Sequence, residues 1–301
     1  MKFLVFGSLN IDKTYAVDAF VKAGQTISAR RMDEYCGGKG FNQAIALRRA
    51  GNEVYFAGAV GRDGQMLLDS LDRNGIDRRF VRQTQGATGH AIIQLDAMGQ
   101  NCIIILAGAN GEITEADADR TLAHFGPGDL VVLQNEITCV PYIMQRARER
   151  GMIVAFNPAP CDERIGACSM ENVDYLLLNE TEGAAMTGES VPAAMLDVLR
   201  CRYPRLNTVL TLGSDGSLYQ GSDGQRLACG ILQTEVADTT AAGDTFTGYF
   251  LSGILRHGDP ASALRQAACA AGIAVSRKGA EPSVPFAAEV DGQRVQCESG
   301  N

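Results

Sequence analysis

Long hydrophobic runs are absent from the sequence. Uninterrupted apolar runs, such as residues 103–106, are far shorter than the roughly 20 residues of a membrane-spanning helix. The apolar stretch that follows Met1 and Lys2 ends at Gly7, which makes it too short for the core of a signal peptide. We therefore expect a cytoplasmic protein without a membrane partner.

Clusters of positive charge are also absent. The net charge is −8, and the aspartate and glutamate residues are scattered rather than run together. An acidic surface without basic clusters argues against nucleic acids and anionic membranes as partners. It does not argue against ATP, because local backbone amides, one or two lysines and a metal ion can form a phosphate site.

Three common sequence signatures are missing. The nine cysteines include no C-x-x-C pair and have no histidine at metal-ligand spacing, which indicates free thiols in a reducing cytosol. A Walker A loop is excluded because Gly38-Lys39 is followed by Gly40 and has Asp33 where a glycine is needed. The dinucleotide fingerprint G-x-G-x-x-G fails because Gln43 stands at its last position.

Hydrophobic residues make up 46 % of the 301 positions, as in a globular protein with a sizeable core. Amphipathic helical segments, for instance 140–150 and 191–200, alternate with short β-rich runs. These β-rich runs cover residues 130–134, 153–157, 175–179 and 208–213. The alternation predicts a single α/β domain over residues 1–301, with a central, mostly parallel sheet and helices on both faces. Ligands of such sheets bind at the carboxyl ends of the strands.

Residues 12–37 and 88–107 interrupt this alternation, because both read as alternating strands of the antiparallel type. In the second stretch, residues 98–101 form a predicted turn between two strands. A hairpin inside an α/β chain is more often an excursion from the main domain than part of its parallel core. We therefore predict that the two stretches form one small β-sheet lid.

The strongest functional motif is D-T-T-A-A-G-D-T-F at residues 238–246. Phe246 and Phe250 follow at helical spacing, so Gly243-Asp244 is predicted to open an amphipathic helix. Small residues at a helix start let backbone amides approach a ligand, and the helix dipole favours an anion there. An aspartate in a first turn is also ordinary helix chemistry. A helix cap, however, needs only one small or hydroxyl residue, whereas this motif has a long stretch of them before Asp244, which favours a ligand site.

Polar residues also stand in two glycine-containing turns near the N-terminus. In G-G-K-G-F-N-Q-A at residues 37–44, Lys39 and Asn42 are three apart and project from one face of a predicted helix. Asn10 and Asp12 follow the first predicted strand and point the same way by strand alternation. An amide beside a carboxylate suits vicinal hydroxyl groups, although each motif alone also fits an ordinary turn.

Two further motifs end later strands. Asn179-Glu180-Thr181-Glu182 closes one strand and begins a helix, so its carboxylates either hold metal-bound water or cap that helix. The glycine-rich stretch 211–216 is either an ordinary hairpin turn or a ledge for a nucleotide.

Taken together and in this order, the motifs resemble the ribokinase/PfkB family of carbohydrate kinases, and its ribokinases most closely. The resemblance runs from residues 7–12 to residues 279–285. Residues 238–246 are very close to the family's second signature. Residues 37–44 are similar to the first, with Phe41 where ribokinases usually carry alanine. Matching positions also occur at 88–89, 108–110, 134–136 and 179–182.

The resemblance implies a role for each matched residue. Asp244 would be the catalytic base, beside an anion hole formed by the amides of Ala241, Ala242 and Gly243. The sugar hydroxyls would be held by Asn10, Asp12, Gly38, Lys39, Asn42 and Glu136. The ATP site would be lined by Asn179, Thr211, Gly213, Gly216 and Gly243, with Glu182 near Mg²⁺. A monovalent cation, expected to be an activating K⁺, would be held by Asp238, Thr240, Ala274, Arg277, Gly279 and Ser283.

The implied reaction is ATP-dependent phosphorylation of a sugar hydroxyl, with D-ribose giving ribose 5-phosphate. The same residues allow a deoxyribose, another furanose sugar or a nucleoside. Residues 23–26 (A-G-Q-T) depart from the family's P-G-E-T, and Ala268 stands where the family has asparagine or histidine near the adenine. A non-catalytic sugar-binding protein on the same fold is a further alternative, but intact Asp244, Lys39 and Glu182 argue against it.

The lid also predicts a homodimer. Strand alternation puts Ile92 and Ile93 on opposite faces, so that an apolar side chain also lies on the face turned away from the substrate. Small isolated sheets are marginal in water, and open edges invite pairing. A second copy of the chain would cover both the outer apolar face and the open edges of the lid sheet. The alternative is a lid that rests on the core of its own chain.

Overall fold

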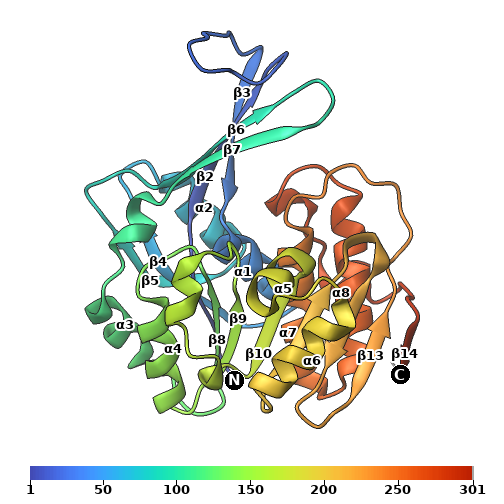
Figure 1. The fold of residues 1–301 in the computed structure, drawn as a ribbon. Coiled ribbons are helices and arrows are strands. Elements are labelled where there is room, and N and C mark those ends of the chain that lie inside the picture. The colour runs from blue at the N-terminus through green and yellow to red at the C-terminus, as the bar shows by residue number, and fades with distance from the viewer. Residues whose placement is uncertain (300–301) are drawn as a thin grey trace.

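The first strand, β1 (Phe3–Phe6), is buried along its whole length. Phe3 and Val5 pack into one hydrophobic cluster, and Leu4 and Phe6 pack into another on the opposite face. A strand that is apolar on both faces needs cover on both sides. The large sheet in the computed structural model, which describes residues 1–299, accordingly lies between two layers of helices (Figure 1).

The large sheet has ten strands in the order β14-β13-β12-β11-β10-β9-β8-β1-β4-β5. Its strands from β11 to β5 run parallel, and β12, β13 and β14 extend one edge in antiparallel pairs. Besides β1 they are β4 (Val54–Val60), β5 (Asp77–Gln83), β8 (Leu130–Gln134), β9 (Ile153–Asn157), β10 (Tyr175–Asn179), β11 (Asn207–Thr211), β12 (Ser217–Gln220), β13 (Arg226–Cys229) and β14 (Cys297–Ser299).

This sheet confirms the predicted α/β class and its mostly parallel core. The predicted runs 130–134, 153–157 and 175–179 coincide with β8, β9 and β10. The fourth run was placed too far along the chain, because β11 ends at Thr211 and Gly213, with φ +56°, begins a short 3₁₀ turn. The glycine-rich stretch that follows β11 is therefore a hairpin turn into β12.

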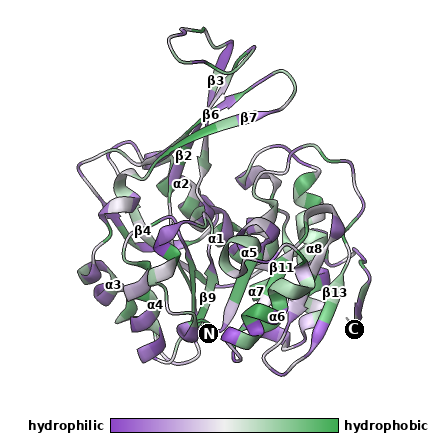
Figure 2. Cartoon of the chain, viewed as in Figure 1, coloured by the Kyte–Doolittle hydropathy of each residue, from purple (hydrophilic) through white to green (hydrophobic). Residues whose placement is uncertain are grey.

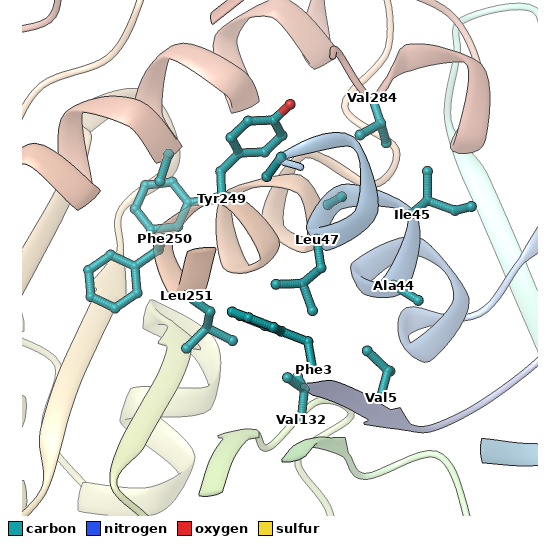
Figure 3. Close-up of a cluster of buried hydrophobic side chains, with 14 of the residues drawn as sticks. Phe3, Val5, Ala44, Ile45, Leu47, Val132, Tyr249, Phe250, Leu251 and Val284 are labelled. Carbon is teal, nitrogen blue, oxygen red and sulfur yellow. The ribbon is translucent and has the colours of Figure 1, made fainter. Parts of the chain in front are cut away.

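Helices cover both faces of the large sheet. They are α1 (Lys39–Arg49), α2 (Gln65–Arg73), α3 (Glu115–Leu122), α4 (Val140–Glu149), α5 (Glu180–Thr187), α6 (Pro192–Arg202), α7 (Ala242–His257), α8 (Pro260–Val275) and α9 (Ala287–Val290). α1, α2, α7 and α8 pack on the face that carries Phe3 and Val5, whereas α3, α4 and α6 pack on the other. Figure 3 shows side chains of β1, α1 and α7 meeting in the first of these cores.

A second sheet projects from the body at the top of Figure 1. Its strands, in the order β3-β2-β6-β7, are β2 (Asn10–Ala16), β3 (Arg31–Gly37), β6 (Gly89–Leu95) and β7 (Asn101–Leu106). The two predicted lid stretches thus form one sheet, but the antiparallel pattern predicted for them is wrong at its centre, where β2 and β6 pair in parallel. The reason is that β2 follows β1 and β6 follows β5, and both of these body strands run in the same direction.

The outer strand of this small sheet is unusually apolar for an exposed strand. Four consecutive residues of β7 are about half exposed, with exposed fractions of 48 % for Ile103, 60 % for Ile104, 58 % for Ile105 and 52 % for Leu106. Figure 2 shows hydrophobic ribbon along β6 and β7. Within residues 1–299, no helix combines the length and the hydropathy that a membrane span requires.

Candidate active site

Polar residues gather where the parallel strands of the large sheet end. Gly7 and Ser8 follow β1, and Gln134, Asn157 and Asn179 are the last residues of β8, β9 and β10. A cavity of about 260 Å³, here called the polar cavity, lies beside these strand ends. It is lined by Lys39, Asn157, Leu177, Leu178, Asn179, Glu182, Thr211, Thr239, Ala241, Ala242, Gly243, Asp244, Phe246 and Thr247.

The start of α7 forms one wall of the polar cavity. Ala241 precedes the helix with φ +60°, a left-handed conformation that is uncommon for a residue with a side chain. The amide of Ala242 donates to the Thr239 carbonyl over 3.3 Å, and that of Thr245 donates to the Ala241 carbonyl. Of the three amides expected to form the anion hole, that of Ala242 is thus engaged by Thr239, whereas those of Ala241 and Gly243 have no hydrogen-bond acceptor within residues 1–299. The amide of Asp244 has none either, so these three amides are free to bind an anion.

The Asp244 carboxylate is buried and held from both sides by amide groups of α1. Asn42 Nδ2 donates to Oδ2 and Gln43 Nε2 donates to Oδ1, each over 3.0 Å. The two helices approach closely because Gly248 of α7 faces Ala46 of α1. A β-carbon on this glycine would lie 2.5 Å from the Ala46 β-carbon. The contact between Asp244 and the start of α1 is thus built into the helix packing.

The glycine-rich turn before α1 brings Lys39 next to Glu136. Gly38 has φ +96°, and a β-carbon on Gly40 would lie 2.5 Å from the Ser8 amide, so the turn requires glycine at both positions. The Lys39 amide donates to Glu136 Oε2 over 2.9 Å, and the Ser8 hydroxyl donates to the same oxygen.

Several carboxylates surround the Lys39 ammonium group. Burial alone would lower the pKa of Lys39, but Asp244, Glu136 and Glu182 outweigh it and raise that pKa above the usual range. Burial raises the pKa of Glu136, and hydrogen bonds from Ser8 and Lys39 offset part of the rise. A cation that stays charged among carboxylates suits the binding of phosphate oxygens or polarised hydroxyl groups.

Asp12 and Asn10 lie on β2, at the base of the small sheet. Burial, with repulsion from Glu136 and Asp244, raises the pKa of Asp12 to about 7. Asn10 Oδ1 accepts a hydrogen bond from Asn110 Nδ2 over 2.8 Å, which turns the Asn10 amide nitrogen away from Asn110 and leaves it as a donor. Neither residue lines the polar cavity, but Asp12 lies close enough to Asp244 and Glu136 for their carboxylates to repel one another.

Asn179 and Glu182 form a capping box at the start of α5. Asn179 Oδ1 accepts from the Glu182 amide over 2.9 Å, and Glu182 Oε2 accepts from the Asn179 amide over 3.0 Å. Both side chains also line the polar cavity. These residues therefore cap the helix, as one of the two predicted roles requires. The second role remains open to them, because each carboxylate oxygen of Glu182 keeps a lone pair that can accept a hydrogen bond from metal-bound water.

A second, larger cavity of about 360 Å³, here called the apolar cavity, shares the start of α7 with the first. It lies between the β11–β12 turn, the irregular segment 230–239 and α8. Among residues 1–299, no charged, amide or imidazole side chain lines it. The lining residues are Thr211, Gly213, Ser214, Gly216, Gly230, Ile231, Leu232, Thr234, Val236, Thr239, Ala242, Gly243, Phe246, Ala268, Ala271, Gly272 and Val275.

The residues expected to hold a monovalent cation are partly brought together. Asp238 Oδ1 accepts from the Thr240 amide and hydroxyl over 2.9 and 2.6 Å, and Oδ2 accepts from the Gly279 amide over 2.9 Å. Burial alone would raise the pKa of Asp238, but these hydrogen bonds lower it, so the carboxylate is ionised.

The other three members of that set make local hydrogen bonds. The Arg277 amide donates to the Ala274 carbonyl at the end of α8. The Ser283 hydroxyl donates to the Ala280 carbonyl over 2.8 Å. Within the described residues, no group of three or more histidine, cysteine, aspartate or glutamate side chains could hold a metal ion.

Sequence reasoning missed several residues of the site. Asn157 lines the polar cavity from the end of β9, and the rule that pointed to Asn179 at the end of β10 would have found it. Ser8 and Gln43 contact Glu136 and Asp244, but nothing in the sequence distinguishes them from ordinary polar residues. The segment 230–239 has no regular secondary structure, so its contribution to the apolar cavity had no periodicity to reveal it.

Comparisons with known proteins agree with this arrangement. The model of the pfkB family of carbohydrate kinases matches residues 1–287. The ribokinase of Haemophilus influenzae is 32 % identical over 290 residues, which cover 93 % of this chain and 94 % of that protein. The deoxyribokinase of Salmonella typhi is 30 % identical over 298 residues, which cover 95 % of this chain and 96 % of that protein.

The solved structures include similar folds of known ligand content. The structure of Arabidopsis thaliana ribokinase complexed with ribose and ATP matches with a TM-score of 0.86 at 30 % identity. The match covers 96 % of each of the two chains. The small sheet and the large sheet therefore belong to one ribokinase-like fold.

Proposed function

This chain belongs to the pfkB family of carbohydrate kinases, and we propose that it transfers the γ-phosphoryl group of ATP to D-ribose, giving ribose 5-phosphate. The observation that carries the proposal is the meeting of the polar and apolar cavities at Ala242 and Gly243. A nucleotide base in the apolar cavity can direct its phosphates over the free amides of α7, toward Asp244 in the polar cavity.

The sugar would bind between the start of α1 and the base of the small sheet. Asn42 uses its Nδ2 on Asp244, while its buried Oδ1 has no hydrogen-bond partner within residues 1–299 and can accept from a sugar hydroxyl. Lys39 Nζ and the free amide of Asn10 supply donors, and Asp12 and Glu136 supply acceptors. Gly38 lets the backbone approach the sugar. This alternation of donors and acceptors suits a ring that carries several vicinal hydroxyl groups.

Asp244 would accept the proton of the attacking hydroxyl as its bond to phosphorus forms. Phosphoryl transfer has a loose transition state, so the protein mainly positions groups and stabilises charge. The free amides of Gly243 and Asp244 meet the second need, and Ala241, through its left-handed turn, presents them.

Mg²⁺ bound to ATP would neutralise charge on the transferred phosphoryl group. Glu182 and Asn179 line the polar cavity and can accept from water molecules around such an ion. Thr211, Gly213 and Gly216 would border the nucleotide at the β11–β12 turn.

We also propose that K⁺ activates the enzyme. Asp238 is ionised and orients Thr240, whose neighbour Thr239 accepts the hydrogen bond of the Ala242 amide. Carboxylate and carbonyl oxygens are suitable ligands for K⁺. The carbonyls of Ala274, Arg277 and Gly279, with the Ser283 hydroxyl, would complete the set. A cation there would order the turn before α7 without touching the substrate.

The small sheet would act as a lid over the sugar and as the interface of a homodimer. Closure over the sugar would exclude water, which would otherwise attack the γ-phosphoryl group. β7 is an edge strand whose four consecutive apolar residues are about half exposed. An exposed apolar edge of this kind is normally covered, and a second copy of the same strand is the simplest cover.

Initial rates of phosphorylation by ATP across pentoses, hexoses and nucleosides test the proposed function. D-ribose should give the highest kcat/KM, and the product should carry phosphorus on its 5-hydroxyl. A higher kcat/KM for 2-deoxyribose or a nucleoside would favour the alternative substrates. An enzyme that phosphorylates none of these compounds would refute the proposal.

A further inference from the structure

Gln43 is completely buried on α1, one position after Asn42, and has no role in the substrate contacts described above. Its Nε2 donates to Asp244 Oδ1 over 3.0 Å and also lies 3.4 Å from Asn157 Oδ1. Its Oε1 accepts from Gln134 Nε2 over 2.7 Å. The side chain therefore joins the end of β8 to the carboxylate at the start of α7.

Gln134 fixes the direction of the Gln43 amide. A carboxamide has one donor end and one acceptor end, and their assignment follows from the hydrogen-bond network. The donor of Gln134 occupies the acceptor end of Gln43, so the donor end of Gln43 faces Asp244. The reverse orientation would put the Gln43 oxygen against a carboxylate oxygen, which is repulsive.

Gln134 in turn has little freedom to move. It is completely buried at the carboxyl end of β8. A β-carbon on Gly7 would lie 2.3 Å from its Oε1, so the strand end after β1 packs directly on this side chain. Close packing and the hydrogen bond to Gln43 thus hold Gln134 in place, while its own Oε1 has no hydrogen-bond partner within residues 1–299.

We infer that Gln43 is a positioning residue that holds the Asp244 carboxylate in its reactive orientation, and that Gln134 sets the direction of Gln43. This inference rests on the proposed function, because it assigns Asp244 the role of base. Asn42 and Gln43 each donate to one oxygen of Asp244, so the plane of the carboxylate is fixed from two sides. Asn42 also faces the sugar, whereas Gln43 is shielded from solvent and acts only through Asp244 and its neighbours.

The substitution Gln43→Met tests the inference, because methionine is similar in length and cannot donate to a carboxylate. We expect kcat to fall about 10–100-fold, and a fall of about fivefold is the smallest that the inference allows. The KM values for sugar and ATP should stay within about threefold of wild type. We also expect the acidic limb of the pH–rate profile to move to higher pH. Loss of the amide donor disfavours the ionised base, an effect that a purely structural role would not produce.

Two further variants keep the test decisive. Gln134→Met should move the acidic limb in the same direction, and the double variant should lose no more kcat than Gln43→Met alone. Asn52→Leu is the matched control, since Asn52 is a buried amide that donates to Leu47 and Ser252 between α1 and α7 but does not touch Asp244. It should lower the melting temperature without moving the limb. If Gln43→Met does not fold, Gln134→Met decides by the same readout.

A fall in kcat of less than fivefold or an unmoved acidic limb, with an active wild type, would overturn the inference alone. A loss confined to KM would do the same. A wild-type protein that phosphorylates no sugar would overturn the proposed function and, with it, the role assigned to Gln43.

Discussion

Gly37 covers the carboxylate of Asp12 so closely that a β-carbon on the glycine would lie 2.0 Å from Asp12 Oδ2. The two residues lie on neighbouring strands of the small sheet, β3 and β2. This contact keeps water from one side of the carboxylate, and burial is the largest cause that raises its pKa to about 7. The proposed sugar site therefore contains an acid with a pKa near neutral pH.

The raised pKa of Asp12 predicts a pH-dependent stability. Its pKa is about 7 in the folded protein and near 3.8 in the unfolded chain, so the folded state binds the proton more tightly. The stabilisation is complete below about pH 4 and is lost progressively as the pH rises from about 4 to about 7. Asp12→Asn cannot ionise at this position, so its unfolding free energy should not show this loss. At pH 8.5 the variant should therefore gain at most about 4 kcal/mol over wild type, relative to the difference between them at low pH.

Urea unfolding of wild type and Asp12→Asn at pH 5 and pH 8.5 checks this expectation. Asp18→Asn is the control, because Asp18 is an aspartate with a side chain that is 71 % exposed. A difference in unfolding free energy between Asp12→Asn and wild type that does not change with pH would contradict the buried, protonated Asp12.

The apolar cavity predicts tolerance toward the base of the nucleotide. Ala268 and its neighbours offer no side-chain amide or imidazole that could read the edge of the base. A pocket without such groups rejects a similar ligand by only about 100-fold. We expect kcat/KM for GTP and ITP to lie within that factor of the value for ATP. A larger preference for ATP would show that the backbone of segment 230–239 reads the base.

Activation by K⁺ predicts that Asp238 is needed for the response. In buffer with tetramethylammonium as the only monovalent cation, wild-type kcat should fall, and added K⁺ should restore it. Asp238→Ala should have low activity with or without K⁺, because the turn before α7 loses both the cation ligand and the hydrogen bonds to Thr240 and Gly279. Equal wild-type rates with and without K⁺ would contradict the proposed cation site.

The exposed strand β7 predicts a dimer in solution. Light scattering at micromolar concentration should give twice the chain mass of 32.0 kDa. Ile104→Lys should shift the mass toward the monomer, because a charge would be buried at the interface. Val191→Lys is the matched control, since Val191 is 58 % exposed at the start of α6, compared with 60 % for Ile104. A wild-type monomer with full activity would contradict the dimer.

The sequence was most informative where structure depends on neighbouring residues. β8, β9 and β10 were found at their observed bounds because buried parallel strands are short apolar runs with polar residues at their ends. The start of α7 was found because a first turn rich in small residues precedes a regular apolar spacing. Both signals are local, so they survive without knowledge of the packing.

The relationships that the sequence did not reveal are non-local. Asn42 and Asp244 are 202 positions apart, and their contact depends on Gly248 packing against Ala46. The parallel pairing of β2 with β6 depends on the common direction of β1 and β5 in another sheet. Gln43 stands among apolar helical residues, and only its distance from the Asp244 carboxylate gives it a function.

The proposed function depends most on Asp244, which would accept the proton of the sugar hydroxyl during phosphoryl transfer. Asp244→Asn keeps the size of the side chain and removes the base, so the fold and the affinity for ribose should change little. The most direct measurement is kcat of Asp244→Asn with ribose and ATP, together with ribose binding by calorimetry. We predict a fall in kcat of about 10²–10⁴-fold with a Kd for ribose within about fivefold of wild type. A variant that binds ribose and keeps more than about a tenth of wild-type kcat would contradict the claim.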